Sequence, residues 1–182
     1  MLSLDDAKKL ATNNFFFDTN VWFYIHGPYA DPSDVCTAKY SDFFASVLKA
    51  RGRIHINSSV VSEFVNRYVR MIYNIEADDY QKQNNRKLEF KAFRKTVKYR
   101  ETVVDVSDDL FHILQSVVQI DTPFSAFDVD GTLKKMSKSG VDFNDLVIID
   151  DCVKNQFILV THDKDFSSCP CRVATANNSM LP

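Results

Sequence analysis

Four acidic residues lie at points in the sequence where they could organise chemistry on a phosphate group. Asp18 ends the apolar run Phe15–Phe17, Asp163 closely follows a second apolar run, and Glu63 and Asp145 lie near the starts of helical patterns. Carboxylates gathered in a small space cannot all stay ionised unless a positive charge compensates them. Mg²⁺ and Mn²⁺ prefer such oxygen ligands, and a bound ion of this kind activates water and stabilises charge on a phosphodiester. The residue types therefore predict metal-dependent nuclease chemistry.

The elements that must position these acids alternate between strands and helices. Five short apolar runs predict strands at 15–17, 54–56, 103–106, 157–160 and 172–174. The helical patterns between them have candidate N-caps at Ser33 or Asp34, at Asn57, Ser58 or Ser59, at Ser107, and at Asp142 or Asn144. This alternation predicts the α/β class, with a central, mostly parallel sheet of four to five strands and helices on both faces. Ligands of such sheets bind beyond the carboxyl ends of the strands, where we expect Asp18 and Asp163.

Each acid also has an ordinary structural explanation. An Asp after a strand is commonly a turn former or a helix cap, and Asp145 could simply interact with the dipole of its helix. Glu63 lies almost opposite the apolar stripe of its own helix, where a solvated Glu would be ordinary. Its selection depends on its place in the first turns of that helix, near the rim of the sheet.

Composition and length predict one soluble domain spanning 1–182. The chain is 45% hydrophobic and contains only 4 Gly and 5 Pro, which excludes collagen-like and wholly disordered chains. No apolar stretch is long enough to span a membrane, and the acidic first residues do not resemble a signal peptide. The 4 Cys form no disulfide framework, which favours a reduced, cytoplasmic setting. Residues 120–141 are predicted to be an irregular loop.

Positive charge is concentrated in one segment although the net charge is only −2. Residues 78–100 are predicted to be helical, and their basic side chains are candidate RNA-binding groups: Arg86, Lys87, Lys91, Arg94, Lys95 and Lys98. Aromatic residues interleave with them, and the combination of phosphate neutralisation with base stacking suits RNA. A solvated helix whose aromatic rings pack inward is an equally good explanation.

A competing motif runs from Phe127 to Leu133 and contains Asp128, Asp130 and Gly131. It matches the nucleophile motif of haloacid-dehalogenase-type phosphatases. The residues before it form a poor buried strand, and too little sequence follows for the rest of that fold. We therefore interpret it as a turn that uses Asp and Gly.

The ordered acidic motifs resemble those of PIN-domain ribonucleases. The matching pieces are Asp18-Thr19-Asn20, Ser62-Glu63-Phe64, Asn144-Asp145 and the run Thr161 to Phe166. The resemblance extends from about Phe15 to Val173. It implies a three-layer α/β domain with an acidic pocket for Mg²⁺ or Mn²⁺ that hydrolyses RNA.

The resemblance also implies roles for individual residues. Asp18, Glu63, Asp145 and Asp163 correspond to the catalytic metal ligands of the family. The supporting positions are Thr19, Asn20, Thr161 and Asp165. Many bacterial relatives are VapC-type toxins with an antitoxin partner, and a homodimer is a further expectation. This chain is longer than the compact toxins, chiefly at 78–100 and 120–141.

The sequence as a whole predicts a cytoplasmic, metal-dependent endoribonuclease, a hydrolase that could serve as the toxin of a toxin–antitoxin pair. The alternative is an RNA- or protein-binding module that keeps the PIN fold without cutting. The presence of all four acids favours the enzyme.

Overall fold

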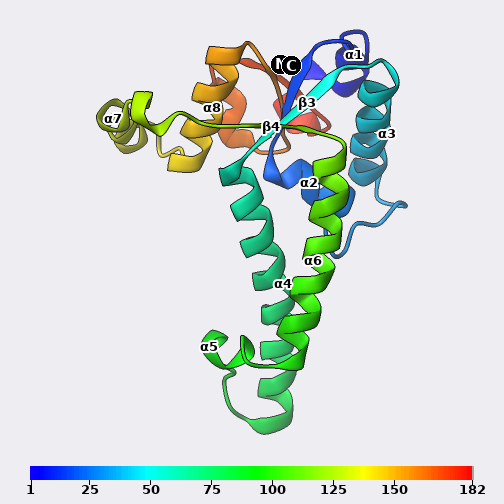
Figure 1. Cartoon of the computed structure of the whole chain (residues 1–182), viewed down its shortest axis with the longest axis vertical. Helices are drawn as coiled ribbons and strands as arrows, with labels where there is room; N and C mark the ends of the chain where they lie inside the picture. Colours follow the sequence, from blue (N-terminus) through cyan, green and yellow to red (C-terminus); the bar gives the residue numbers. More distant parts are fainter. Residues whose placement is uncertain (182) are drawn as a thin grey trace.

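In the computed structural model, which describes residues 1–181, one six-stranded sheet forms the centre of the molecule (Figure 1). Its strands are β1 (Leu2–Ser3), β2 (Asn14–Phe17), β3 (Arg53–Asn57), β4 (Val118–Ile120), β5 (Ile158–Val160) and β6 (Arg172–Thr175). They lie in the order β1-β6-β5-β2-β3-β4, and every neighbouring pair is parallel. The central strand β2 carries Phe15, Phe16 and Phe17, whose side chains are completely buried.

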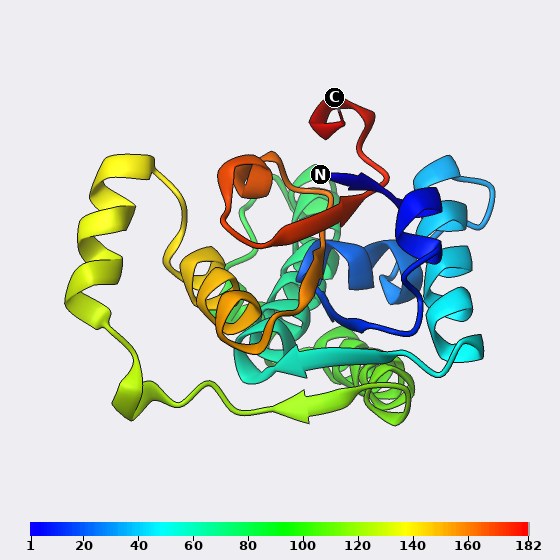
Figure 2. The same ribbon diagram turned by 90° about the horizontal axis from the view of Figure 1, so that it is seen from above.

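Helices cover both faces of this sheet and give the three-layer α/β architecture that the sequence predicts. They are α1 (Leu4–Lys8), α2 (Thr19–His26), α3 (Val35–Lys49), α4 (Ser58–Asn84), α5 (Phe90–Phe93), α6 (Val97–Gln115), α7 (Val129–Ser139) and α8 (Phe143–Asn155). Figure 2 shows α1 and α3 on one side of the strands and α8 on the other.

Three predicted helix starts are confirmed, because each cap residue accepts a backbone hydrogen bond in the first turn. Asp34 accepts from Thr37 N at the start of α3, and Asn57 accepts from Val60 N at the start of α4. Asp142 caps α8 in the same way. The cap at Asn57 directly follows β3, so α4 begins at the carboxyl edge of the sheet.

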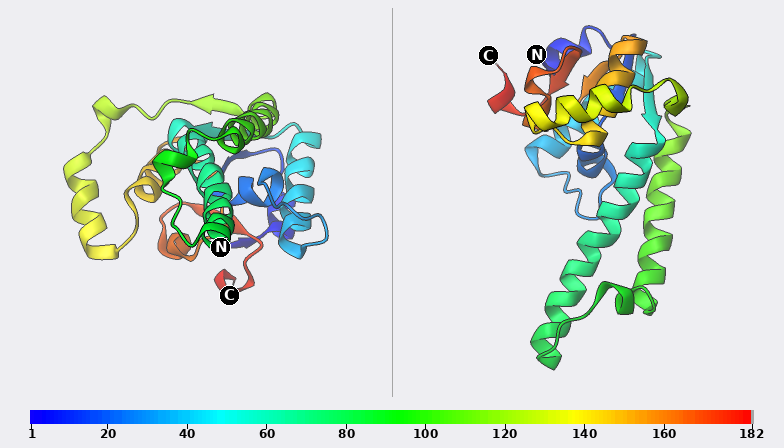
Figure 3. Two further views of the ribbon diagram at one scale, coloured as in Figure 1. Left: turned by 90° about the horizontal axis from the view of Figure 1, so that it is seen from below. Right: turned by 90° about the vertical axis from the view of Figure 1, so that its left-hand side faces the viewer.

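The long helices α4 and α6 leave the sheet side by side and form an arm with α5 at its tip (Figures 1 and 3). A small apolar cluster of Val69, Tyr73 and Phe93 is buried between these elements. The Tyr73 hydroxyl donates to the carbonyl of Leu88 at 2.8 Å and fixes the turn at the tip. Although α4 has 27 residues, no helix within residues 1–181 is long and apolar enough to cross a membrane.

The predicted strand at 103–106 is wrong, because these residues lie inside α6. Thr96 rather than Ser107 caps this helix, accepting from Tyr99 N. The β-branched run suggests a strand by propensity, but packing of Thr102 and Val106 against the rest of the arm overrides that preference. The strand that follows is β4, at Val118–Ile120.

The basic segment 78–100 is not one helix. Asn85 adopts a left-handed conformation with φ 50° and ends α4, as Asn and Gly commonly do at this position. The chain then turns, forms the short α5 and enters α6 at Val97. The segment therefore makes the tip of the arm.

The prediction of an irregular loop at 120–141 is wrong for half of its length. Val129–Ser139 form α7, which Figure 2 shows at the end of an extended connection from β4, beside α8. Asp128 caps this helix by accepting from Gly131 N. A Cβ on Gly131 would lie 2.1 Å from the Asp128 carboxylate, so any larger residue there would displace the capping side chain.

Three further differences concern short elements. The sheet has six strands rather than four to five, because the two-residue β1 pairs outside β6 and makes 172–175 an internal strand. Two residues are too few to produce a strand pattern in a sequence. Helix α2 was not predicted either, because only Asp18 separates its first residue from the end of β2.

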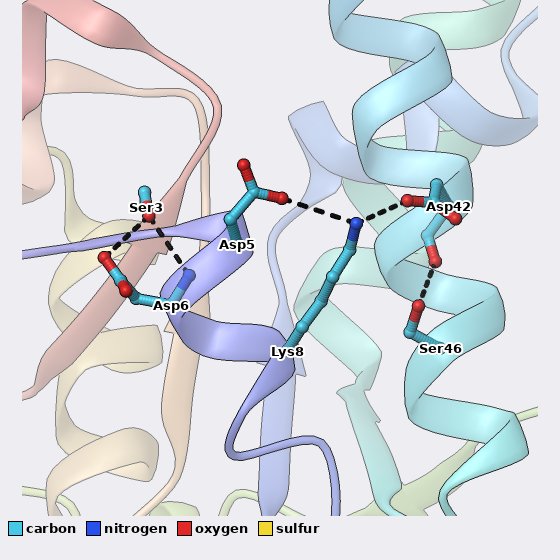
Figure 4. A network of polar contacts seen from close by, with 6 residues as sticks. All are labelled: Ser3, Asp5, Asp6, Lys8, Asp42 and Ser46. Carbon is cyan, nitrogen blue, oxygen red and sulfur yellow. Dashed lines mark hydrogen bonds and ion pairs between the residues drawn. The ribbon is translucent and has the colours of Figure 1, made fainter.

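A polar network attaches α1 to α3 (Figure 4). Ser3 caps α1, and the Lys8 ammonium group lies between the carboxylates of Asp5 and Asp42. Its pairing with Asp42 raises the pKa of Lys8. These contacts hold the first helix against the sheet, on which β1 pairs with β6.

Candidate active site

Asp18 lies at the point where the strand order of the sheet reverses. Its backbone N–H donates to the carbonyl of Val160 at 3.0 Å, which places it at the carboxyl ends of the adjacent strands β2 and β5. From β2 the chain proceeds to β3 on one side, and from β5 it proceeds to β6 on the other. Such a switch point is where ligands bind in open α/β sheets.

Three donors fix the Asp18 carboxylate, which is only 5% exposed. Thr161 Oγ1 donates to Oδ2 at 2.7 Å, and the Asn20 amide donates to the same oxygen. The backbone N–H of Thr19 donates to Oδ1 at 2.6 Å. Thr19, Asn20 and Thr161, which the sequence suggests as supporting residues, therefore all contact Asp18.

Glu63 joins this network from the start of α4. Its Oε2 accepts a hydrogen bond from Thr19 Oγ1 at 3.2 Å, and its side chain is partly buried. The helical periodicity alone places Glu63 on a solvated face, but the first turns of α4 lie at the rim of the sheet and direct it toward Thr19.

Asp163 approaches from the loop after β5. Its backbone N–H donates to Thr161 Oγ1 at 3.0 Å, and its own Oδ1 accepts from the backbone N–H of Asp165 at 2.9 Å. Asp165 is exposed and contacts the network through its backbone amide. The structure thus places Asp165 beside Asp163, with its carboxylate outside this set of hydrogen bonds.

The electrostatics of Asp18 reflect its surroundings. Burial raises the pKa of Asp18 to about 6, hydrogen bonds from Thr161 and Thr19 oppose this change, and the charges of Glu63 and Asp163 add to it. A raised pKa means that the charged form is disfavoured until something compensates it.

Asp145, in the first turn of α8, is linked to the other acids by charge. Burial raises the pKa of Asp145 to about 7, and the negative charges of Asp18, Asp142, Asp163 and Glu63 add to the increase. The charges of the other three acids predicted from the sequence therefore all act on Asp145. Asp142 is a fifth acid nearby, and it caps the same helix.

The set of donors suits a hard cation, although the side chains do not form a closed cage. No three His, Cys, Asp or Glu side chains within residues 1–181 are grouped closely enough to constitute a ready-made metal site. In the same part of the chain, none of these four carboxylates pairs with Lys, Arg or His. Oxygen ligands carrying uncompensated negative charge fit Mg²⁺ or Mn²⁺, which retain several waters when bound.

Polar residues that the sequence does not single out support the loop after β5. The Tyr40 hydroxyl lies 3.1 Å from the carbonyl of Thr161 and 3.0 Å from His162 Nδ1, and it accepts from Ala176 N at 3.1 Å. Asn177 donates to the carbonyl of His162 at 2.8 Å. In the sequence, Tyr40 is only one apolar member of a helical stripe.

The candidate RNA-binding residues lie away from the acids. All six are exposed near the tip of the arm: Arg86, Lys87, Lys91, Arg94, Lys95 and Lys98. At a rise of about 1.5 Å per residue, the 21 positions from Glu63 to Asn84 span about 30 Å. The basic tip and the acids thus form two separate surfaces joined by α4.

Comparison with solved structures shows a shared fold. The chain resembles a chain in the crystal structure of VapBC2 from Rickettsia felis bound to a DNA fragment from their promoter. The TM-score is 0.55 and the sequence identity is 17%, and the match covers 89% of this chain and 98% of the chain in that structure. It also resembles PAE2754 from Pyrobaculum aerophilum, with a TM-score of 0.51 and 13% identity over 94% of this chain and 89% of the other. No curated protein sequence matches significantly.

The sequence itself matches the family described as PIN domain over residues 15–170. This span includes all four acids, together with Thr19, Asn20 and Thr161. PIN-domain proteins are typically nucleases and generally use divalent metal ions. The chain belongs to the PIN-domain family.

Proposed function

We propose that this protein is a metal-dependent endoribonuclease whose active site contains Asp18, Glu63, Asp145 and Asp163. The observation that carries the proposal is the hydrogen-bonded grouping of Asp18, Glu63 and Asp163 through Thr19 and Thr161 at the switch point of the sheet, with Asp145 near enough for their charges to raise its pKa. No basic side chain in residues 1–181 forms an ion pair with them. A divalent cation would supply the missing positive charge.

In this proposal the chain contributes a set of oriented oxygen ligands. Thr161 and Asn20 hold one oxygen of Asp18, and Thr19 links Asp18 to Glu63. When bound, Mg²⁺ or Mn²⁺ would polarise the phosphodiester and activate water for hydrolysis. The four carboxylates would hold the ion, and the basic tip of the arm would hold the RNA backbone.

The substitution Asp18→Asn tests this assignment. The amide cannot carry the negative charge, so we expect loss of Mn²⁺-dependent cleavage of labelled RNA by at least about a hundredfold, the scale typical of lost active-site electrostatics. Circular dichroism should show an intact fold.

Asp128→Asn is the matched control, since Asn also caps helices and Asp128 lies in the competing phosphatase motif. Its cleavage rate should equal that of the parent. If Asp18→Asn cut RNA as fast as the parent, Asp18 would not belong to the active site. Failure of the parent to cut varied RNAs, with or without chelator, would favour the binding module.

We further propose an antitoxin partner and a homodimer. The support is the similarity to a chain of the VapBC2 structure, a likeness that extends over most of both chains. Sedimentation of the purified protein, alone and after co-expression with the product of an adjacent gene, tests both. A monomer that gains no partner would contradict this part of the proposal and leave the nuclease assignment intact.

A further inference from the structure

A cavity of about 670 Å³ adjoins the acids on one side. It shares Asn20 and Asp163 with the candidate active site and extends between the end of α2, the loop that follows it and the side of α4. A volume of this size is within the range of small-molecule sites in proteins. The question is which chemical group its walls suit.

Aromatic rings supply much of the wall. Phe23, Tyr24 and Tyr29 all line the cavity, and Tyr29 lies at its edge with 58% of its surface exposed. Tyr24 is held in place by Tyr40 and His162, with ring centroids 5.2 and 5.0 Å away. The recess therefore has one fixed ring and one accessible ring, which are suitable for stacking on a flat ligand.

Arg67 adds a positive charge to the wall of the cavity. It follows Glu63 by four residues on α4, so both side chains project from the same face of the helix. Its guanidinium group lies 4.7 Å from the centre of the Phe23 ring. Within residues 1–181 it forms no ion pair with a carboxylate, which leaves it able to bind a phosphate.

Of the four acids that line the cavity, Asp163 belongs to the candidate active site and Asp165 lies beside it, while Asp31 and Asp34 are hydrogen-bonded within the chain. Asp31 accepts from both the N–H and the hydroxyl of Ser33, and Asp34 accepts from Thr37 N. These carboxylates serve the loop and the cap of α3. A neutral flat ring attached to a phosphate matches the aromatic faces and the positive charges of Arg67 and Lys164, which also line the cavity.

We propose that this cavity binds one unpaired nucleobase of the RNA, stacked against Tyr29 and Tyr24, with Arg67 on its phosphate. The inference rests on the proposed function, since it assigns a subsite next to the acids that would cut the strand. Stacking between the two rings requires that the base be unpaired, because both of its faces must be available.

Binding without cleavage tests the subsite separately from the enzyme. A fluorescein-labelled, eight-nucleotide RNA of mixed sequence is titrated with the full chain in EDTA, and its dissociation constant is measured by fluorescence anisotropy. The RNA is then replaced by a series in which each position in turn is abasic. For the parent we expect one position at which base removal weakens binding about tenfold, within the range known for single base–aromatic stacks.

The variant Tyr29→Ala should bind the intact RNA more weakly and show a clearly smaller further loss with that abasic RNA than the parent does, because only the contact with Tyr24 remains. Tyr29→Phe keeps the ring and should behave as the parent does. Phe111→Ala, which removes another exposed ring from outside the cavity, is the matched control. It should leave every dissociation constant unchanged.

Two kinds of result would overturn the subsite: the parent fails to bind or has no sensitive position, or Tyr29→Ala shows the same abasic penalty as the parent. Because EDTA prevents metal-dependent cutting, neither result bears on catalysis. If the nuclease assignment were wrong, the parent would instead fail to cleave RNA in the presence of Mn²⁺. The two failures are therefore distinguishable.

Discussion

At the scale of single residues, Thr161 is the connection among the acids. Its hydroxyl donates to Asp18 and accepts from the backbone N–H of Asp163, and the Asn20 amide lies 3.1 Å away. It is fully buried. One side chain thus orients ligands that come from two strands, which makes it a positioning residue rather than a metal ligand.

Thr161→Val keeps the shape of this side chain and removes its hydrogen bonds. We expect Mn²⁺ affinity, measured by isothermal titration calorimetry, to fall about 10- to 100-fold, as for other residues that orient metal ligands. Thr161→Ser retains the hydroxyl and should bind Mn²⁺ nearly as the parent does. Equal affinity in the Val variant would show that Thr161 does not orient the site.

The raised pKa of Asp145 predicts a particular dependence of stability on pH. Between its ordinary value of 3.8 and its folded value of about 7, the folded chain holds a proton that the unfolded chain has released. The resulting stabilisation is complete below the lower value and is lost as the pH rises through the upper one. In chelator, the melting temperature of Asp145→Asn should therefore exceed that of the parent by more at pH 8 than at pH 5.

Adding Mn²⁺ at pH 8 should raise the melting temperature of the parent, because an ion that binds only the folded state stabilises that state. The effect on Asp145→Asn should be smaller, because the variant lacks one of the proposed ligands. Asp150→Asn, on the same helix but paired with Lys154, is the control and should not gain stability at pH 8. An unchanged difference between Asp145→Asn and the parent from pH 5 to pH 8 would contradict the electrostatic explanation.

At the scale of elements, the arm has an apolar interior and a basic tip. Its interior contains the apolar cluster of Val69, Tyr73 and Phe93, and its tip carries exposed basic side chains. The sequence left two explanations for the aromatic residues of segment 78–100, RNA stacking or inward packing. Phe93 is buried, so inward packing applies to this residue. Arg70 lies over the Phe90 ring, 3.8 Å from its centre.

Charge reversal at Lys91, Arg94 and Lys95 tests whether this tip holds RNA. Each phosphate contact on a single strand contributes about −0.7 to the slope of log affinity against log salt, so removing three contacts should reduce the slope by about 2. Filter binding at several salt concentrations in EDTA measures it.

The same change at Lys134, Lys135 and Lys138 on α7 provides a control with equal net charge. We expect a smaller effect there, because α7 lies beside α8 at the other side of the molecule from the arm (Figure 1). If both triple variants altered the slope equally, the arm would have no special role.

Much of this arrangement was predictable from local pattern. Phe15–Phe17 and Ile158–Val160 are apolar on both faces, as buried parallel strands require, so the acids that follow them could be assigned to one rim. The arm was not predictable, since residues 103–106 continue a helix only because Thr102 and Val106 are buried where α6 packs beside α4. Likewise, Tyr40 acquires its polar role only because the fold brings Thr161 to its hydroxyl.

At the scale of the whole molecule, charge is divided between two regions. The acids lie at the rim of the sheet, the excess of positive charge lies near the tip of the arm, and α4 connects them over about 30 Å. A strand of nucleic acid attracted to the tip would have to reach the rim to be cut. The proposed substrate is therefore an RNA long enough to contact both regions at once.

The pairing of β2 with β5 also sets the order in which the site can be assembled. Asp18 and Thr161 are hydrogen-bonded although 143 positions separate them. Contacts this distant form late, because a long loop must close first. During translation, a ribosome would release Asp18 long before Thr161, so a nascent chain would lack the strand that completes the pocket. Under the proposed function, an incomplete chain would therefore be unable to cut the messenger RNA from which it is being translated.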